Sequence, residues 1–329
     1  MPWDWTPEPR ARLASYLQDR GLTDGEITTT PIGDGHSNLT HLVADGKHVV
    51  VVRRPPPPPF PPGAHDVLRE ARVIGALSST RVPVAQLLAT AQAGEVVDVP
   101  LYVMTFAAGQ IVTTETPPAL ASAHRRIGEA LVDTLADLHT VDWRSAGLED
   151  FGRPEGFNDR HRRRIAQLVT DSRLAEIDDW LAAHVPAESG ASIIHNDYRI
   201  GNLVLSAEHP GELVAVLDWE LATIGDPLLD LGYFLASVPD EDGPLTPTQE
   251  FGRAMLEPGY PTRKELADRY AVRTGTTLDN LNWYMTFALW KLAVLYEYSR
   301  RQGKDPYYAD PAHVPSFLEA ASRAAGLEL

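Results

Sequence analysis

The chain has 329 residues, of which 29 are Lys or Arg and 45 are Asp or Glu, so its formal charge at pH 7 is −16. Hydrophobic residues make up 43 % and charged residues 22 %, which is typical of globular rather than disordered or fibrous proteins. The acidic balance argues against a nucleic-acid-binding protein, because such proteins need a basic face to displace counterions. The absence of cysteine excludes disulfides and thiolate chemistry.

No apolar run approaches the roughly 20 residues that a membrane-spanning helix requires. The N-terminal sequence Met1-Pro2-Trp3-Asp4-Trp5 lacks the basic and apolar regions of a signal peptide. We therefore expect a soluble, cytoplasmic protein that binds neither membranes nor nucleic acid.

The first hundred residues are expected to form strands around one helix. Residues 64–77 carry apolar side chains at helical spacing. Seven of the eight residues 55–62 are proline, which predicts a stiff polyproline-like segment on the surface. The strand candidates, the first two joined by the turn dipeptide Asp45-Gly46, are 39–44, 48–52, 86–90 and 101–106.

After residue 120 the pattern becomes mainly helical. The helix candidates are the segment ending near His139 and the segments 158–168, 173–183, 262–272 and 278–299. We expect an N-terminal lobe over residues 1–109, with a hinge near 104–109, and a C-terminal lobe over 110–329. The expected fold class is α+β, with a small antiparallel-sheet lobe that contains one helix and a larger, mainly helical lobe.

The strongest chemical signal is the run His195-Asn196-Asp197-Tyr198-Arg199-Ile200-Gly201-Asn202, followed by Asp218-Trp219-Glu220. Asp197 and Asn202 fit one loop that presents both groups to one site, where Asp197 accepts the proton of an attacking hydroxyl. Asp218 follows a short strand-like run and completes an oxygen-rich set suited to Mg²⁺. The alternative is that these are turn and cap residues. The occurrence of both motifs in this order favours phosphoryl transfer.

From about Ile32 to about Ala236, the sequence resembles the aminoglycoside phosphotransferase and choline kinase family, whose members share a two-lobe, protein-kinase-like fold. The resemblance is densest at the two motifs above, and the run from Gly225 to Leu231 is also typical of the family. Asp226 is expected to cap the helix that begins there. The roles that the resemblance implies are catalytic base for Asp197, magnesium ligand for Asn202 and Asp218, and structural support of the catalytic loop 195–202 for His195 and Asp230.

The resemblance also implies a nucleotide-binding side in the N-terminal lobe. The run Gly33-Asp34-Gly35-His36-Ser37-Asn38 resembles the loop that covers the phosphates, because two glycines let backbone N–H groups approach phosphate closely. Gly33, Gly35, Ser37 and Asn38 are its candidate contacts. An ordinary turn is the alternative.

The resemblance further implies that a basic residue at the end of the third strand, paired with a Glu on the next helix, binds the phosphates. Arg53 and Glu70 occupy these positions, and arginine replaces the lysine of protein kinases. The apolar run before Arg53 and Arg54 leaves open which of them points inward, and we favour Arg53. Surface charges flanking a strand are the alternative. The resemblance also implies that the last strand lines the adenine pocket, with Met104 and Phe106 as candidates; the alternative is that these two residues are simply core.

Two features concern the acceptor substrate. Arg160, Arg163 and Arg164 share one face of a predicted helix and are candidates for binding an anionic acceptor, with a solvated helix face as the alternative. The aromatic residues of 283–298 have the helical spacing that is usual for core residues. The alternative is that they line a substrate pocket.

The resulting prediction is an ATP- and Mg²⁺-dependent kinase that phosphorylates a hydroxyl of a small molecule. The segments 52–56 and 64–72 resemble the kinase-like domain attached to some acyl-CoA dehydrogenases. That resemblance suggests a hydroxyacyl-CoA acceptor, whereas the family name suggests an aminoglycoside-like one. The alternatives are a nucleotide-binding pseudokinase or interaction module, and a protein kinase. The chain has no Asp-Phe-Gly motif at Asp218, which argues against a protein kinase.

Overall fold

The computed structural model describes residues 5–33, 38–59, 65–240 and 244–327. The chain divides into two compact units. The first unit contains the chain up to Ala108 together with Ala215–Glu220, and the second contains Gly109–Val214 and the chain from Leu221 onward. The sequence pattern predicts residues 218–220 in the helical lobe. They group with the first unit because Arg53 forms ion pairs with Asp218 and Glu220, and Val216 N–H donates to Pro83 O at 2.8 Å.

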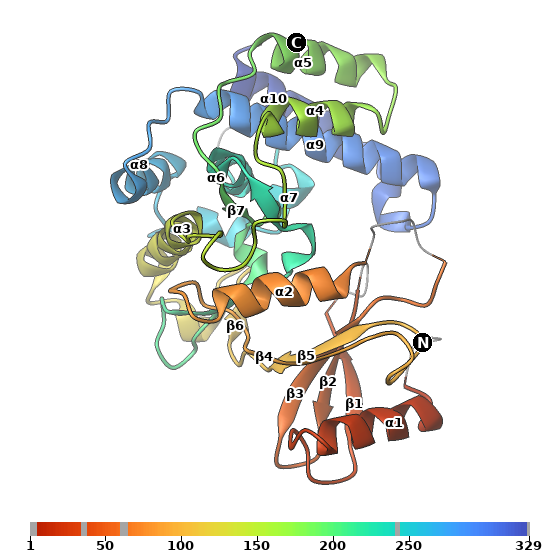
Figure 1. Cartoon of the computed structure of the whole chain (residues 1–329). Helices are drawn as coiled ribbons and strands as arrows, with labels where there is room; N and C mark the ends of the chain where they lie inside the picture. The colour runs from red at the N-terminus through yellow and green to blue at the C-terminus, as the bar shows by residue number, and fades with distance from the viewer. Residues whose placement is uncertain (1–4, 34–37, 60–64, 241–243, 328–329) are drawn as a thin grey trace. The chain divides into compact units, whose positions relative to one another are not determined.

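The first unit is built on one antiparallel sheet whose strands lie in the order β1-β2-β3-β5-β4 (Figure 1). Two helices, α1 (Pro7–Gln18) and α2 (Val67–Leu77), accompany the sheet. Asp66 caps α2 by accepting from Arg69 N–H at 3.0 Å. The strands are β1 (Thr28–Ile32), β2 (Leu39–Ala44), β3 (Val49–Arg54), β4 (Leu87–Ala91) and β5 (Leu101–Thr105).

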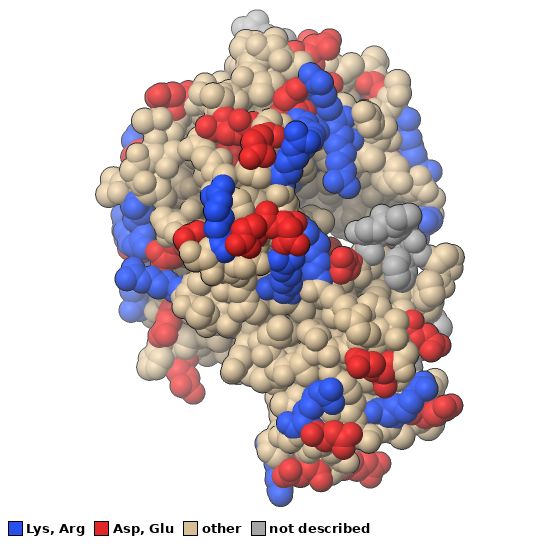
Figure 2. All heavy atoms as spheres, in the orientation of Figure 1, with Lys and Arg blue, Asp and Glu red and all other residues tan. Residues whose placement is uncertain are grey.

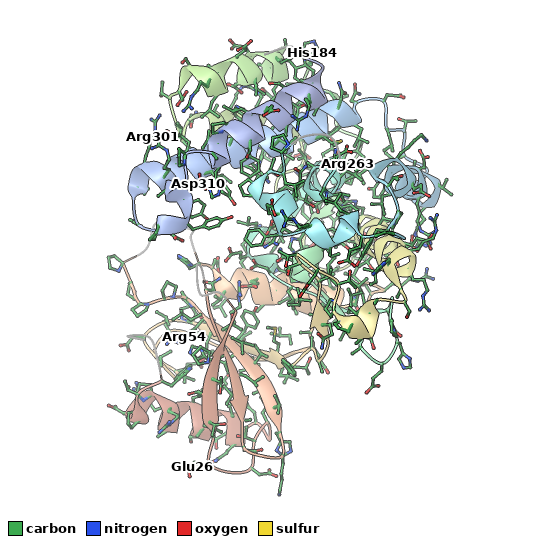
Figure 3. The ribbon with its side chains drawn as sticks, turned by 180° about the vertical axis from the view of Figure 1, so that it is seen from behind. Glu26, Arg54, His184, Arg263, Arg301 and Asp310 are labelled. Carbon is green, nitrogen blue, oxygen red and sulfur yellow. The ribbon has the colours of Figure 1, made fainter. Side chains whose placement is uncertain are left out.

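Successive side chains of β3 point to opposite faces of the sheet. Val50 and Val52 belong to the core that α1 forms with the sheet, and the Arg54 guanidinium lies 5.0 Å from the centroid of the Trp5 ring on that side. Figure 3 labels Arg54 beside the strands of the sheet. Arg53 points to the opposite face, where its Nε donates to Glu70 of α2 at 3.0 Å. The two arginines therefore lie on opposite faces, and Arg53 is the one that pairs with Glu70.

The second unit is mainly helical and is organised around α9, the longest helix. This helix packs against α4, α5, α6 and α10 and buries Trp283, Phe287 and Trp290. The indole nitrogens of Trp283 and Trp290 donate to Leu181 O and Leu174 O, both at 3.0 Å, so these aromatics are core rather than pocket wall. The helices are α3 (His124–His139), α4 (Phe157–Ala166), α5 (Ser172–Ala183), α6 (Pro227–Ser237), α7 (Pro247–Glu250), α8 (Arg263–Thr274), α9 (Leu281–Gln302) and α10 (His313–Ala325).

Short strands carry the loops of the second unit. β7 pairs antiparallel with β10, β6 pairs antiparallel with β8, and the chain leaves the unit within β9. These strands are β6 (Gln110–Ile111), β7 (Ser192–Ile194), β8 (Leu203–Leu205), β9 (Leu213–Val216) and β10 (Thr223–Gly225). The 3₁₀ turns are Pro118–Leu120, Ile200–Asn202, Trp219–Leu221, Arg253–Leu256 and Pro306–Ala309.

The α+β class and most of the predicted elements are confirmed. The sequence did not predict α1, β1 or α10. β1 contains a proline and has no buried residue, so it lacks the apolar alternation of a half-buried strand. Pro57–Pro59 are exposed as expected, whereas Pro55 is buried. Among the residues that the structure describes, no helix is both long and apolar enough to cross a membrane. On the face drawn in Figure 2, acidic and basic side chains lie next to one another.

Candidate functional site

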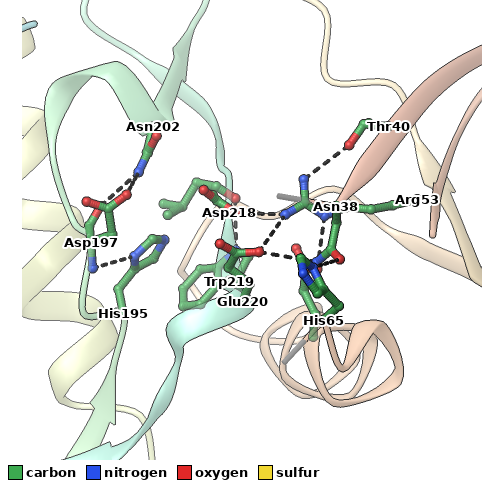
Figure 4. A network of polar contacts seen from close by, with 12 residues as sticks. Asn38, Thr40, Arg53, His65, His195, Asp197, Asn202, Asp218, Trp219 and Glu220 are labelled. Atoms are coloured by element: carbon green, nitrogen blue, oxygen red, sulfur yellow. Dashed lines mark hydrogen bonds and ion pairs between the residues drawn. The ribbon is translucent and has the colours of Figure 1, made fainter. Parts of the chain in front are cut away.

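Arg53 is the centre of the polar network in the first unit (Figure 4). Its guanidinium donates to Glu70 Oε2 at 3.0 Å, to Thr40 Oγ1 at 3.1 Å and to Asp218 Oδ1 at 2.7 Å. Burial alone lowers the pKa of Arg53, but the neighbouring carboxylates, with Glu70 foremost, raise it above its ordinary value. The arginine is therefore a fixed cation held between carboxylates from α2 and from the 215–220 segment.

Asp218 is held in an uncommon backbone conformation, with φ of 63°. A non-glycine residue at positive φ costs about 1–3 kcal/mol and persists only where its surroundings hold it. The ion pair with Arg53 supplies part of that restraint. Two residues further on, Glu220 lies 3.6 Å from Arg53 and accepts a hydrogen bond from Asn38 Nδ2 at 3.2 Å. The segment therefore presents two carboxylates beside one guanidinium.

In the second unit, the loop after β7 fixes both carboxylate oxygens of Asp197. Asn202 Nδ2 donates to Asp197 Oδ2 at 2.8 Å and to Asp197 O at 2.8 Å. The Tyr233 hydroxyl donates to Asp197 Oδ1, and Arg199 Nε lies 3.6 Å from the same oxygen. The side chain of Asp197 is 22 % exposed, so the carboxylate stays accessible while its orientation is set.

Asp230, on α6, lies beneath this loop and is completely buried. It accepts hydrogen bonds from His195 N–H at 2.5 Å and Asn196 N–H at 2.7 Å, and His139 Nε2 lies 3.5 Å away. Burial acts to raise the pKa of Asp230, but His139 and the backbone donors outweigh it and hold the pKa below its ordinary value. Asp230 is therefore a buried carboxylate that anchors the start of the loop.

The predicted cap of α6 is confirmed, because Leu228 N–H donates to Asp226 Oδ1 at 3.1 Å. Asp226 has further donors: the Tyr284 hydroxyl at 2.7 Å, Asn158 Nδ2 at 2.8 Å, and Ser189. This fully buried residue therefore joins α4, α6 and α9.

The other predicted site residues occupy varied surroundings. Gly33 has φ of +81°, which favours glycine, whereas Gly35 and Ser37 lie outside the described residues. Met104 is half-buried, and Phe106 is 46 % exposed. Arg160 donates to backbone carbonyls of Arg153 and Glu155. Arg163 pairs with Asp159 at 2.8 Å, and Arg164 is exposed, so two of the three arginines are engaged in local contacts.

An aromatic side chain that was not identified from the sequence lies near Arg199, the residue that pairs with Asp197. The Arg199 guanidinium lies 5.6 Å from the centroid of the Phe251 ring, which in turn lies 6.3 Å from that of Tyr307. Phe251 and Tyr307 are 41 % and 38 % exposed. Large exposed aromatic side chains next to a site commonly mark a contact surface.

The oxygen donors of Asn202 and Asp218 are of the kind that a magnesium ion binds. Among the described residues, no cluster of three His, Cys, Asp or Glu side chains is arranged to hold a metal. Mg²⁺ requires fewer protein ligands, because it binds one or two carboxylates together with water and substrate phosphates. Asn202 uses its amide nitrogen on Asp197, which directs its amide oxygen elsewhere, and Asp218 keeps a 35 % exposed carboxylate. Each residue separately fits the role of an oxygen ligand to Mg²⁺.

Comparisons with known proteins identify the family. Residues 28–266 match the model of the phosphotransferase enzyme family. The chain belongs to this family. Its relatives include acyl-CoA dehydrogenase family member 11 of Gallus gallus, 33 % identical over 82 % of this chain, and acyl-CoA dehydrogenase family member 10 of Mus musculus, 28 % identical over 87 %. The chain spans only about a third of these relatives, 36 % and 28 % of their lengths.

Solved structures of phosphotransferases share the fold. A Ralstonia eutropha protein that carries the name of an aminoglycoside phosphotransferase is 26 % identical, with a TM-score of 0.77 over 96 % of this chain and 98 % of that one. Aminoglycoside 2′-phosphotransferase-IIIa, solved with GDP, has a TM-score of 0.63 over 96 % and 98 % of the two chains at 15 % identity. The predicted family, its acyl-CoA dehydrogenase branch and the kinase-like fold class are confirmed.

Proposed function

We propose that the protein is an ATP-dependent kinase that transfers the γ-phosphate to a hydroxyl group of a small molecule. The observation that carries the proposal is the geometry of Asp197, whose two carboxylate oxygens are oriented by Tyr233 and Asn202 on a loop anchored by Asp230. Membership of the phosphotransferase family, and the GDP complex of a structural neighbour, support nucleotide-dependent phosphoryl transfer.

In the proposed reaction, Asp197 accepts the proton of the acceptor hydroxyl as its oxygen attacks the γ-phosphorus. The bond between the γ-phosphorus and the bridging oxygen breaks, and ADP leaves. Arg53, held by Glu70, binds the ATP phosphates, and the backbone around Gly33 and Asn38 covers them. The first unit is therefore the proposed nucleotide-binding lobe, and residues 104–109 are its proposed adenine-binding segment and hinge.

Asn202 and Asp218 are the residues that we propose as magnesium ligands. When bound, Mg²⁺ neutralises charge on the phosphates that accumulates as the reaction proceeds. His195 supports the loop, because its Nδ1 lies 3.2 Å from Asp197 N–H. A cytoplasmic location belongs to the same proposal, since ATP is the donor.

The residues around Asp197 indicate which chemical class of acceptor the site favours. A polycationic aminoglycoside needs carboxylates around the hydroxyl that reacts. In the second unit, Nε of Arg199 instead lies 3.6 Å from Asp197, and an exposed aromatic ring lies beside that guanidinium. A cation with apolar neighbours favours an acceptor with an anionic group and an apolar portion. A hydroxyacyl-CoA meets this description, and the names of the relatives agree with it.

The test is a thermal shift followed by an acceptor screen. A ligand at 100 times its Kd stabilises the folded state by about 2.7 kcal/mol, so millimolar MgATP is expected to raise the melting temperature by several degrees. Release of ADP is then measured with hydroxyacyl-CoAs, free hydroxy acids and aminoglycosides. A melting shift without turnover on any acceptor supports the pseudokinase alternative. If MgATP does not change the melting temperature, both the kinase and the pseudokinase are contradicted.

A further inference from the structure

Lys291 is a buried charged residue to which the proposed reaction assigns no role. It lies on α9 within the apolar run from Phe287 to Leu295, and the residue is only 8 % exposed. Its Nζ donates to the carbonyl oxygen of Asn196 at 3.2 Å and lies 4.9 Å from the centroid of the Tyr233 ring. Isolated ammonium groups are very costly to bury, so a lysine at this position requires compensating partners.

The hydrogen-bond partner of Lys291 belongs to the catalytic loop. Burial lowers the pKa of Lys291, whereas the charges of Asp197 and Asp230 act to raise it. The three charged groups come from the loop, from α6 and from α9. The direct contact of Lys291 is with the residue that precedes the proposed base, since its Nζ donates to Asn196 O.

Asn196, the residue before Asp197, is restrained at three polar groups. Its φ is 68°, in the left-handed region that is strained for a non-glycine residue. Its N–H donates to Asp230 at 2.7 Å, and its side-chain amide donates to Leu221 O at 2.9 Å. The bond from Lys291 fixes its carbonyl. Because that carbonyl belongs to the peptide that joins Asn196 to Asp197, its orientation determines where the Asp197 side chain points.

We propose that Lys291 is a positioning residue for phosphoryl transfer, which holds the Asn196–Asp197 peptide so that Asp197 meets the acceptor hydroxyl. This inference rests on the proposed function, because it assumes that Asp197 is the base. Lys291 does not contact the substrate in this scheme and acts through the loop. Lys291 and Asn196 are 95 residues apart in the sequence, so their hydrogen bond makes α9 part of the support of the catalytic loop.

The test compares Lys291→Met with a matched control on the same helix. Methionine keeps the length and the apolar stem but removes the donor and the charge. The control is Glu297→Gln, because Glu297 is also a buried charged residue, with a side chain 1 % exposed, but pairs with Arg300 and Arg301. Three properties are measured on the full chain: hydrogen exchange of the amides of 195–197, kcat at saturating acceptor, and KM for ATP.

Lys291→Met is expected to accelerate exchange at residues 195–197 and to lower kcat by about 10–100-fold, the range for a hydrogen bond from a charged group. KM for ATP and the melting shift with MgATP are expected to stay unchanged. Glu297→Gln is expected to lower the melting temperature alone. A Lys291→Met protein that melts earlier but keeps its exchange and kcat would show a purely structural role and overturn the proposal.

Lys291→Arg serves as the conservative variant, because it retains a cation and a donor. It is expected to recover loop protection and most of kcat. If Lys291→Met does not fold, Lys291→Arg decides: slow exchange with retained turnover supports the proposal, whereas failure of both variants to fold assigns Lys291 to stability and contradicts it. If the wild-type protein phosphorylates no acceptor, the proposed function fails, but the exchange measurement still reports whether Lys291 holds the loop.

Discussion

The Tyr233 hydroxyl on α6 donates a hydrogen bond to Oδ1 of Asp197, while Asn202 donates to Oδ2 of the same carboxylate. A carboxylate has about four lone-pair positions, so both oxygens can still accept from a substrate. The two bonds fix the plane of the carboxylate before a substrate arrives. Tyr233 itself is buried, and burial raises the pKa of its phenol well above its ordinary value, so the phenol remains a donor.

Tyr233→Phe is expected to lower kcat about 10-fold, because it removes one of the two groups that orient the base. KM for ATP should be unchanged, since the Tyr233 hydroxyl bonds to Asp197, which is assigned to the acceptor hydroxyl and not to the nucleotide. Steady-state kinetics with varied ATP measure both parameters. Loss of ATP affinity with normal kcat would contradict the role assigned to the tyrosine.

The Arg53–Glu70 ion pair allows stability to be separated from nucleotide binding. Arg53→Met leaves the buried Glu70 carboxylate without its cation, and breaking a buried pair costs about 3–5 kcal/mol. The double variant Arg53→Met/Glu70→Gln removes that unpaired charge and should recover most of the stability. Both variants should lose the melting shift with MgATP. A double variant that keeps the shift would exclude Arg53 as a phosphate ligand.

Sequence patterns predicted most elements because their apolar periodicity is strong, and they located the polar loop because its motif is contiguous. They could not decide between Arg53 and Arg54, because both faces of β3 are covered and Val49 to Val52 show no alternation. Only the register of the strand assigns the two arginines to opposite faces.

The roles of Tyr233 and Lys291 near the catalytic loop were not predicted from the sequence, for a different reason. Each lies in an apolar stretch of its helix, and only tertiary packing brings Tyr233 to Asp197 and Lys291 to Asn196. A lone lysine inside the apolar run of α9 was the one available signal. The placement of residues 215–220 in the first unit likewise depends on ion pairs between distant segments.

Gly201→Ala tests Arg199 without changing any charge. A Cβ at Gly201 would lie 2.5 Å from Nη1 of Arg199, so the flexible guanidinium must move. If Arg199 binds an anionic group of the acceptor, KM for the acceptor should rise several-fold while KM for ATP stays constant. Equal changes in both constants would indicate general damage to the loop instead.

His161 predicts how stability depends on pH. Burial lowers the pKa of this imidazole to about 3, with further lowering by Lys291, Arg164 and Arg160. The ring stacks on Phe157, with centroids 5.3 Å apart. The unfolded chain binds the proton near pH 6.5 and the folded chain does not, so stability falls between about pH 6.5 and 3, by up to about 1.4 kcal/mol per pH unit.

His161→Phe should remove this acid-side slope and leave stability above pH 7 no lower. Melting temperatures of both proteins from pH 4 to 8 measure the difference. Parallel curves for wild type and variant would show that His161 titrates normally in the folded state.

The most direct test of the proposed function compares Asp197→Asn with Asp218→Asn in single-turnover phosphoryl transfer and in melting with and without Mg²⁺. Asp197→Asn should keep the melting shift with MgATP but slow transfer by about 10²–10⁴-fold, the usual contribution of a general base. Asp218→Asn should lose the magnesium-dependent part of the shift as well as transfer. An Asp197→Asn protein that loses nucleotide binding but transfers phosphate at the normal rate when saturated would contradict the assignment of Asp197 as the base.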